Sequence, residues 1–168
     1  MKKRSRYLTH AAIIAALYAV MTHLQNLILA GSASWANQLR LSEALCILAF
    51  FTPAAIPGLT IGCLLFNLTF SAALPLDFLA GSLATYLAAR GMWLTRNRKI
   101  QNIPLPGLLL PAITNGLLVG WELTVSIGGG FAFNALSVAI GELAVLLVPG
   151  TLLYLAFKKR GLDGILFL

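Results

Sequence analysis

Charged residues are scarce in this sequence. Only 10% of its 168 residues are Asp, Glu, Lys or Arg, five of these are acidic, and 59% of all residues are hydrophobic. About a quarter of the residues of a typical soluble domain are charged. The composition therefore excludes an ordinary soluble protein, and it predicts a single integral membrane domain over residues 1–168.

The motifs of common catalytic sites are also absent. The sequence has no GxxxxGK[ST] phosphate-binding loop, and it has neither an HExxH nor a GxSxG motif. His10 and His23 lie thirteen positions apart on one predicted helix, which does not favour a metal site. Cys46 and Cys63 fall in apolar runs, where a thiol is usually a small buried hydrophobe. We expect no enzyme activity, and no cofactor or metal ion in this chain.

Basic residues lie at the ends of the apolar runs. Eleven of the twelve fall in three clusters, which are Lys2-Lys3-Arg4 with Arg6, Arg90 with Arg96-Arg98-Lys99, and Lys158-Lys159-Arg160. This distribution is typical of cytoplasmic loops in membrane proteins. The net charge of +7 is therefore better explained by membrane topology than by a nucleic-acid partner, which we do not expect.

The apolar runs predict an all-α membrane protein with six transmembrane helices and both termini in the cytoplasm. The Lys-rich start resembles a signal peptide, but the run that follows it is long enough to span a bilayer and to be retained. The predicted helices cover about residues 7–29, 41–52, 56–74, 76–94, 105–127 and 131–157.

The short second run leaves an ambiguity. If all three basic clusters are cytoplasmic, residues 41–74 must begin and end outside, either as two crossings or as a deep re-entrant hairpin. As an α-helix, residues 41–51 would extend roughly 17 Å, which is short for a crossing. We favour two crossings broken at Pro53 to Gly58. Arg40 is then the one basic residue outside.

Four of the five acids lie in or beside apolar segments, where a charge costs about 3 kcal/mol on insertion scales. Such residues usually face a partner or a ligand. Helical spacing brings several polar residues toward one cavity that opens to the outside. The candidate substrate-binding residues are Trp35, Arg40, Glu43, Asn67, Asp77, Trp121, Glu122, Asn134, Ser137 and Glu142.

Two faces contribute most to this expected cavity. Asn115, Glu122 and Ser126 share one face of the fifth helix, and the glycine triplet 128–130 makes the fifth and sixth helices sequential neighbours. Glu122 is therefore expected to meet Asn134 near the outer surface. Trp121 would supply a stacking plane for a flat ligand.

Structural roles remain open for several of these residues. Asn67 can be an interhelical hydrogen-bonding residue, and Arg40 with Glu43 can be an interfacial ion pair. Asp77, which follows a proline closely, can cap a helix. Trp121 can be an interface anchor.

The first helix carries a stripe of small residues. At 100° per residue, the stripe falls on one side of that helix and comprises Ala11, Ala12, Ala15, Ala16 and Ala19. Small residues allow another helix to approach closely, either within this protein or from a partner.

Several motifs resemble the QueT family. They are Arg40-Leu-Ser-Glu43-Ala-Leu, Phe51-Thr-Pro-Ala-Ala-Ile-Pro-Gly58, Gly62-Cys-Leu with Asn67, Gly81-Ser-Leu-Ala-Thr85, Asn115, Gly120, Glu122-Leu, Asn134-Ala-Leu-Ser-Val and Gly141-Glu-Leu. The resemblance covers nearly the whole chain.

The resemblance implies an S-component, the substrate-binding membrane subunit of a bacterial energy-coupling factor (ECF) importer. Such a subunit lies in the cytoplasmic membrane and binds its micronutrient from the outside. It associates with a transmembrane scaffold subunit and two ATPase subunits, which use the ATP. The family's substrates would be queuosine precursors, namely queuine or other 7-deazaguanines. An Ala-x-x-x-Ala pattern on the first helix would contact the scaffold, and both Ala11/Ala15 and Ala12/Ala16 fit.

Two other functions compete with this one. A stand-alone proton-coupled carrier of small solutes would use Glu122 and Glu142 as proton relays, although no internal sequence repeat supports such a carrier. A membrane assembly protein without transport activity would use only its alanine stripes, the one on the first helix and a second one at Ala80, Ala84 and Ala88 of the fourth.

Overall fold

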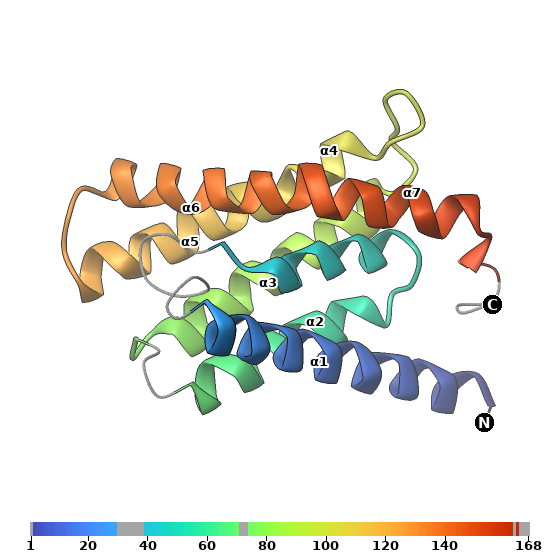
Figure 1. Cartoon of the computed structure of the whole chain (residues 1–168), viewed down its shortest axis with the longest axis horizontal. Coiled ribbons are helices and arrows are strands. Elements are labelled where there is room, and N and C mark those ends of the chain that lie inside the picture. Colours follow the sequence, from blue (N-terminus) through green and yellow to red (C-terminus); the bar gives the residue numbers. More distant parts are fainter. Residues whose placement is uncertain (1, 30–38, 71–73, 163, 165–168) are drawn as a thin grey trace.

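The computed structural model describes residues 2–29, 39–70, 74–162 and 164, which contain helices and no strand. The helices run roughly along the long axis of the molecule (Figure 1). In chain order, the elements are α1 (Lys2–Ile28), η1 (Leu41–Phe50), α2 (Ala55–Thr69), α3 (Asp77–Thr95), α4 (Leu105–Leu108), α5 (Leu110–Ser126), α6 (Phe131–Val145), η2 (Leu146–Gly150) and α7 (Thr151–Lys159). Grouped by continuity, the elements form six helical segments, of which the fifth comprises α4 and α5 and the sixth comprises α6, η2 and α7. The predicted all-helical fold is confirmed for these residues.

Prolines divide the last two segments. Pro111 stands in the first turn of α5, which separates α5 from the short helix α4. Pro149 lies inside the π-helical segment η2, where a residue without an amide hydrogen cannot continue the α-helical hydrogen-bond ladder. The fifth and sixth segments are therefore composite, although each was predicted as one continuous helix.

The second segment differs most from the prediction, because η1 is a 3₁₀-helix. The amide of Glu43 donates to the carbonyl of Arg40 at 3.0 Å, and Phe51 donates to Leu48 at 3.0 Å, each three residues back. A 3₁₀-helix rises about 2.0 Å per residue, so ten residues extend roughly 20 Å rather than about 15 Å. The short run therefore reaches farther than an α-helix of the same length.

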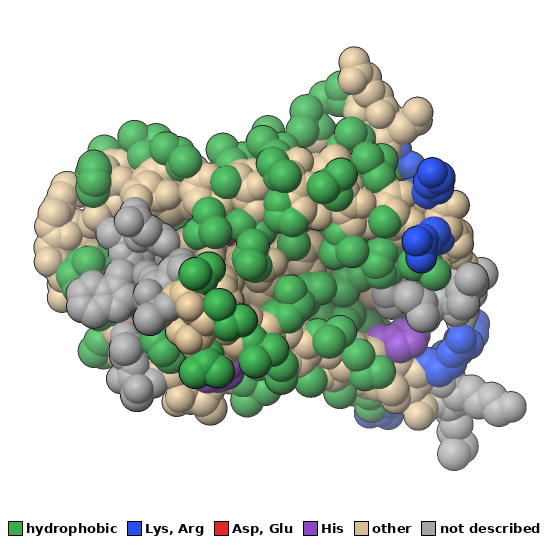
Figure 2. All heavy atoms as spheres, in the orientation of Figure 1, with side chains coloured by type: hydrophobic (Ala, Val, Ile, Leu, Met, Phe, Trp, Pro, Cys, Tyr) green, Lys and Arg blue, Asp and Glu red, His purple; other side chains and the backbone are tan. Residues whose placement is uncertain are grey.

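Three helical stretches are long and apolar enough to cross a membrane: Lys3–Ile28, Leu105–Ser126 and Phe131–Lys159. Leu41–Phe50 and Ala55–Thr69 are shorter apolar helices. Hydrophobic side chains cover much of the flank of the molecule shown in Figure 2. Such a surface is suited to lipid rather than to water.

Both ends of the chain lie at the same end of the bundle (Figure 1). Lys and Arg side chains gather at that end (Figure 2). The turn from η1 to α2 also lies there, whereas η1 begins and α5 passes to α6 at the opposite end. We call these the basic end and the opposite end.

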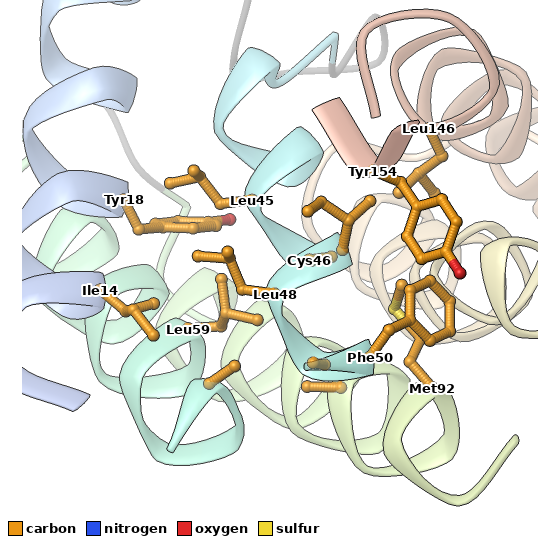
Figure 3. Close-up of a cluster of buried hydrophobic side chains, with 14 of the residues drawn as sticks. Ile14, Tyr18, Leu45, Cys46, Leu48, Phe50, Leu59, Met92, Leu146 and Tyr154 are labelled. Atoms are coloured by element: carbon orange, nitrogen blue, oxygen red, sulfur yellow. The ribbon is translucent and has the colours of Figure 1, made fainter. Parts of the chain in front are cut away.

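The 3₁₀-helix η1 is the centre of the fold. All its residues from Ser42 to Phe50 are buried, as expected for a helix that is hydrophobic on every side. Figure 3 shows side chains of α1, α2, α3 and the sixth segment surrounding it, among them Tyr18, Leu59, Met92 and Tyr154.

Two helix pairs pack closely through glycines. A Cβ atom on Gly62 of α2 would lie 2.7 Å from the Cβ of Tyr18 on α1. A Cβ atom on Gly120 of α5 would lie 2.6 Å from the Cα of Ala135 on α6. Because neither space admits a side chain, α1–α2 and α5–α6 approach each other more closely than larger residues would allow.

Candidate ligand site

The three-residue repeat of η1 places Glu43 and Cys46 on one side of the helix, since side chains three apart eclipse in a 3₁₀-helix. The Cys46 thiol donates to Glu43 Oε2 at 3.0 Å, and the Tyr18 hydroxyl donates to Glu43 Oε1. Both carboxylate oxygens of Glu43 therefore have partners within the protein. We infer that Glu43 mainly supports the site.

A polar face of α1 holds the start of η1. Thr22 Oγ1 donates to Ser42 Oγ at 2.6 Å, one turn beyond the Tyr18 contact. Gln25 donates to the Leu39 carbonyl and accepts from the Leu41 amide at 2.8 Å. The sequence prediction did not include Tyr18, Thr22 and Gln25. Their spacing along one face of an apolar helix was the signal that would have found them.

Arg40 reaches α2. Its guanidinium lies 3.5 Å from Asn67 Oδ1 and 3.7 Å from Cys63 Sγ, and its Cζ is 5.4 Å from the centre of the Phe66 ring. The predicted site residues Arg40 and Asn67 are thus brought together. The prediction assigned no polar role to Cys63, because a thiol in an apolar run reads as a small hydrophobe.

Asp77 is joined to the same part of the structure. Its carbonyl accepts from Asn67 Nδ2 at 2.8 Å, and its Oδ2 accepts from the Leu74 amide at 2.9 Å. The N-cap position of α3 is Leu76, and Asp77 is in the first turn. The expected capping role is therefore corrected: the carboxylate organises the chain just before α3, and it makes no N-cap hydrogen bond.

Glu142 lies deeper, against α5. Its Oε1 accepts from Asn115 Nδ2 at 2.9 Å. The residue is 3% exposed, and its Oε2 has no hydrogen-bond partner among the residues described. The structure thus pairs Glu142 of α6 directly with Asn115 of α5.

Glu122 follows the same pattern nearer the end of α5. Its Oε1 accepts from Ser126 at 2.8 Å, as expected for residues on one helical face. Glu122 is fully buried, and Oε2 lacks a partner within the described part of the chain. Glu122 and Glu142 therefore each keep one carboxylate oxygen that no described residue binds.

Glu122 and Asn134 were predicted to meet, but among the described residues each forms its hydrogen bonds with other partners. Asn134 Nδ2 donates to Thr124 Oγ1 at 3.0 Å and to the Gly128 carbonyl at 3.1 Å, which uses both hydrogens of the amide. Asn134 thus closes the turn between α5 and α6. Gly128 has φ of +87°, a conformation that glycine adopts readily.

The remaining candidate ligand-binding residues are two tryptophans and a serine, of which the structure describes one tryptophan and the serine. Trp121 is 51% exposed and follows Gly120 on the outside of α5, so the structure does not bring it to the buried acids. This exposed position suits an interface anchor rather than a stacking plane for a buried ligand. Ser137 is half-buried on α6. Trp35 lies outside the described residues.

Arg40 is the basic residue that the buried acids share. It interacts electrostatically with Glu122 and Glu142, and also with Glu43 and Asp77. Four acids and this single basic residue are buried in the described structure. An arrangement with excess carboxylate can bind a ligand that supplies hydrogen-bond donors or positive charge.

The alanine stripe divides into two sides. Ala11 and Ala15 are buried against α2, and Ala19 is half-buried. Ala12 and Ala16 are exposed. They lie along a surface groove of about 450 Å³ between α1 and α2, whose other walls include Tyr7, Pro57 and Ile61. The structure thus distinguishes the two registers, which the sequence left equivalent.

Comparisons with known proteins agree with the transport interpretation. No curated protein and no solved structure matched the chain. The family model described as QueT transporter matches residues 8–159, which is nearly the entire chain. The chain therefore belongs to the QueT transporter family.

Proposed function

We propose that this protein is the substrate-binding S-component of an ATP-driven ECF importer, and that it binds queuosine precursors of the 7-deazaguanine class. The family match supports a transporter, and the unused carboxylate oxygens of Glu122 and Glu142 support ligand recognition. The latter observation carries the proposal. A buried carboxylate oxygen without a partner is costly, and a bound donor would offset that cost.

The hydrogen-bonding edge of a 7-deazaguanine fits Glu142, the deeper of the two acids. A 7-deazaguanine presents a ring N–H and an amino group side by side, and a carboxylate accepts from such a pair well. Asn115 uses one amide hydrogen for Glu142 and has a second one for the carbonyl oxygen of the base. Glu142 and Asn115 would together recognise the polar edge of the ring.

The ligand would approach from the end opposite the basic residues. Basic residues favour the cytoplasmic side, so the opposite end would face outward in the cytoplasmic membrane of a bacterium. Arg40 at the start of η1 and Glu122 near the end of α5 lie toward that outer end. This orientation supports uptake rather than export.

The partners would dock on α1. Ala12 and Ala16 are the exposed pair of the stripe, whereas Ala11 and Ala15 are occupied by α2. A helix of the ECF scaffold subunit would pack along the groove beside Ala12 and Ala16, because small residues permit close approach in lipid. Two ATPase subunits bound to the scaffold would supply the energy.

A thermal-shift panel of purines and 7-deazaguanines, measured on the purified chain in detergent, tests the proposed substrate. We expect 7-deazaguanines to raise the melting temperature and adenine to leave it unchanged, because adenine presents a different donor edge. If no 7-deazaguanine raises the melting temperature, the proposed substrate class is wrong. Uptake by the chain alone under a proton gradient would instead support a proton-coupled carrier.

A further inference from the structure

A second groove lies on the surface between α2 and α3, near the basic end of the molecule. Its volume is about 450 Å³. Ile56 and Thr60 of α2 line it, as do Tyr86 and Arg90 of α3 and Tyr7 of α1. We call it the α2–α3 groove. It is distinct from the buried acids and from the groove beside Ala12 and Ala16.

The polar side chains of this groove lie toward the basic end. Tyr86 and Arg90 are four positions apart, so they share one side of α3, and Arg90 is roughly 6 Å nearer the basic end. Tyr7 directly follows the first basic cluster of the chain on α1. Tyrosine is enriched where a membrane meets water, because its ring is apolar and its hydroxyl is polar. This part of the groove therefore fits the lipid–water interface.

Farther from the basic end, the groove is apolar. Ile56 and Pro57 lie in the first turn of α2, and Ile61 lies one turn beyond them. The hydroxyl of Thr60 donates to the carbonyl of Ile56 at 2.8 Å, so its hydrogen is used within α2. The groove thus has a polar margin followed by hydrocarbon, which is the order of the parts of a phospholipid.

Arg90 brings a positive charge to the margin of the groove. Its side chain is exposed, and no ion pair joins it to any residue that the structure describes. Four of the five acids are buried and do not line the groove, and they are Glu43, Asp77, Glu122 and Glu142. The fifth acid, Asp163, lies outside the described residues. An anion is therefore the complementary partner for this margin.

We propose that the α2–α3 groove binds an anionic phospholipid from the leaflet at the basic end. Arg90 binds the phosphate through two of its N–H groups, and the Tyr86 hydroxyl, one turn deeper, donates to the ester oxygens of the glycerol. An acyl chain lies against Ile56 and Ile61. The inference does not depend on the buried acids or their ligand. It uses only the proposed orientation, in which the basic end faces the cytoplasm.

The lining favours a lipid over an extended peptide. A peptide in this groove would bring its backbone N–H and C=O groups to the level of Ile61, where the lining offers them no partner, and such groups are costly inside a membrane. An acyl chain has no polar groups to satisfy. Anionic lipids are concentrated in the cytoplasmic leaflet, and basic pockets between transmembrane helices on that side bind their headgroups.

Native mass spectrometry of the full chain tests the proposal, because it distinguishes bound lipids by mass. The chain is purified in detergent, freed of lipid, and mixed with equal amounts of phosphatidylglycerol and phosphatidylcholine that carry the same acyl chains. We expect the parent to retain at least about fivefold more phosphatidylglycerol, because the cation of phosphatidylcholine would face Arg90. Equal retention of the two lipids would overturn the proposal.

Variants of Arg90 assign this preference to the groove. Arg90→Gln should abolish it, and Arg90→Lys should keep most of it, because lysine retains the charge. Arg98→Gln is the matched control, since Arg98 is also exposed near the basic end but does not line the groove. If Arg90→Gln and Arg98→Gln lower the preference equally, the lipid responds to the net charge of this end, and the proposal is wrong.

A bulky substitution tests the apolar part without changing the charge. Thr60 is half-buried and lines the α2–α3 groove but not the groove beside Ala12 and Ala16. Thr60→Trp should lower the retention of phosphatidylglycerol by about tenfold, because the indole occupies the place of the acyl chain. Gel filtration and thermal unfolding establish that the variant is folded. Parental retention by the folded variant would place the lipid elsewhere and contradict the proposal.

Two further measurements separate this lipid from other occupants. Arg90→Gln should co-purify with the scaffold subunit as the parent does. If it instead loses the scaffold and retains phosphatidylglycerol, the groove is a protein contact and the proposal is wrong. Soluble glycerol 3-phosphate at the same concentration as the lipid should not displace it, because the acyl chains supply part of the affinity. Displacement would show a site for free phosphate esters and would also overturn the proposal.

Discussion

Bulky substitutions on the two sides of the alanine stripe should have opposite consequences. Ala12 is exposed in the groove between α1 and α2, whereas Ala15 is buried, and its carbonyl lies 2.8 Å from the position of a Cβ on Gly62. We predict that Ala12→Trp folds and binds its ligand but does not join the complex. Ala15→Trp, on the same helix, should instead destabilise the fold.

The magnitudes follow from packing. An indole ring at position 12 would hold a partner helix away and remove on the order of twenty carbon–carbon contacts, each worth about 0.1–0.2 kcal/mol. The loss of about 2–4 kcal/mol corresponds to a roughly 30- to 1000-fold weaker association. At position 15, the ring would have to separate α1 from α2, and overpacking of this kind costs about 1–3 kcal/mol or more.

Co-purification measures the first effect. Tagged parent and variant chains would be expressed with the scaffold and ATPase subunits, and the bound subunits would be quantified after affinity purification. Ala12→Trp should retain ligand binding in a thermal-shift assay but recover little scaffold. If both Ala12→Trp and Ala16→Trp assemble like the parent, the groove is not the docking surface.

Three further predictions test the orientation and the polar contacts. A cysteine at Gly129 should react with an impermeant maleimide applied from outside, and one at Asn97 should not; labelling at Asn97 would contradict the orientation. Tyr18→Phe leaves Glu43 Oε1 without its donor, so it should destabilise the fold by about 1–3 kcal/mol in reversible unfolding, and unchanged stability would remove this contact from the account. Asn134→Ala removes both hydrogen bonds that close the α5–α6 turn, so it should increase proteolysis there, and parental resistance would count against the contact.

The sequence predicts the helical segments well because an apolar helix is recognised from the average hydrophobicity of many consecutive residues. It does not predict their finer geometry. The 3₁₀ form of η1 arises in a helix that neighbours surround on every side, and no local pattern distinguishes it from an α-helix. The break in the sixth segment could have been expected from Pro149.

The sequence predicted acids within apolar segments, which the structure buries, but it did not predict which residues would contact them. A buried acid in an apolar run is evident from sequence, and Glu122 with Ser126 follows from helical spacing. The partner of Glu142 on another helix, or of Glu43 on α1, depends on tertiary packing that periodicity does not contain. The prediction for Trp121 failed for a different reason. Trp121 is next to Glu122 in the sequence, but it is exposed on another side of α5, whereas Glu122 is buried.

Calorimetric titration of 7-deazaguanine into the purified chain and its Glu142→Gln variant tests the central claim most directly. The substitution replaces an acceptor by an amide donor opposite the N–H groups of the base, which should cost about 2–4 kcal/mol, or roughly 30- to 1000-fold in affinity. The account predicts saturable binding by the parent and this loss in the variant, with both proteins folded. Equal affinity of the parent and Glu142→Gln, or no binding by the parent, would contradict it.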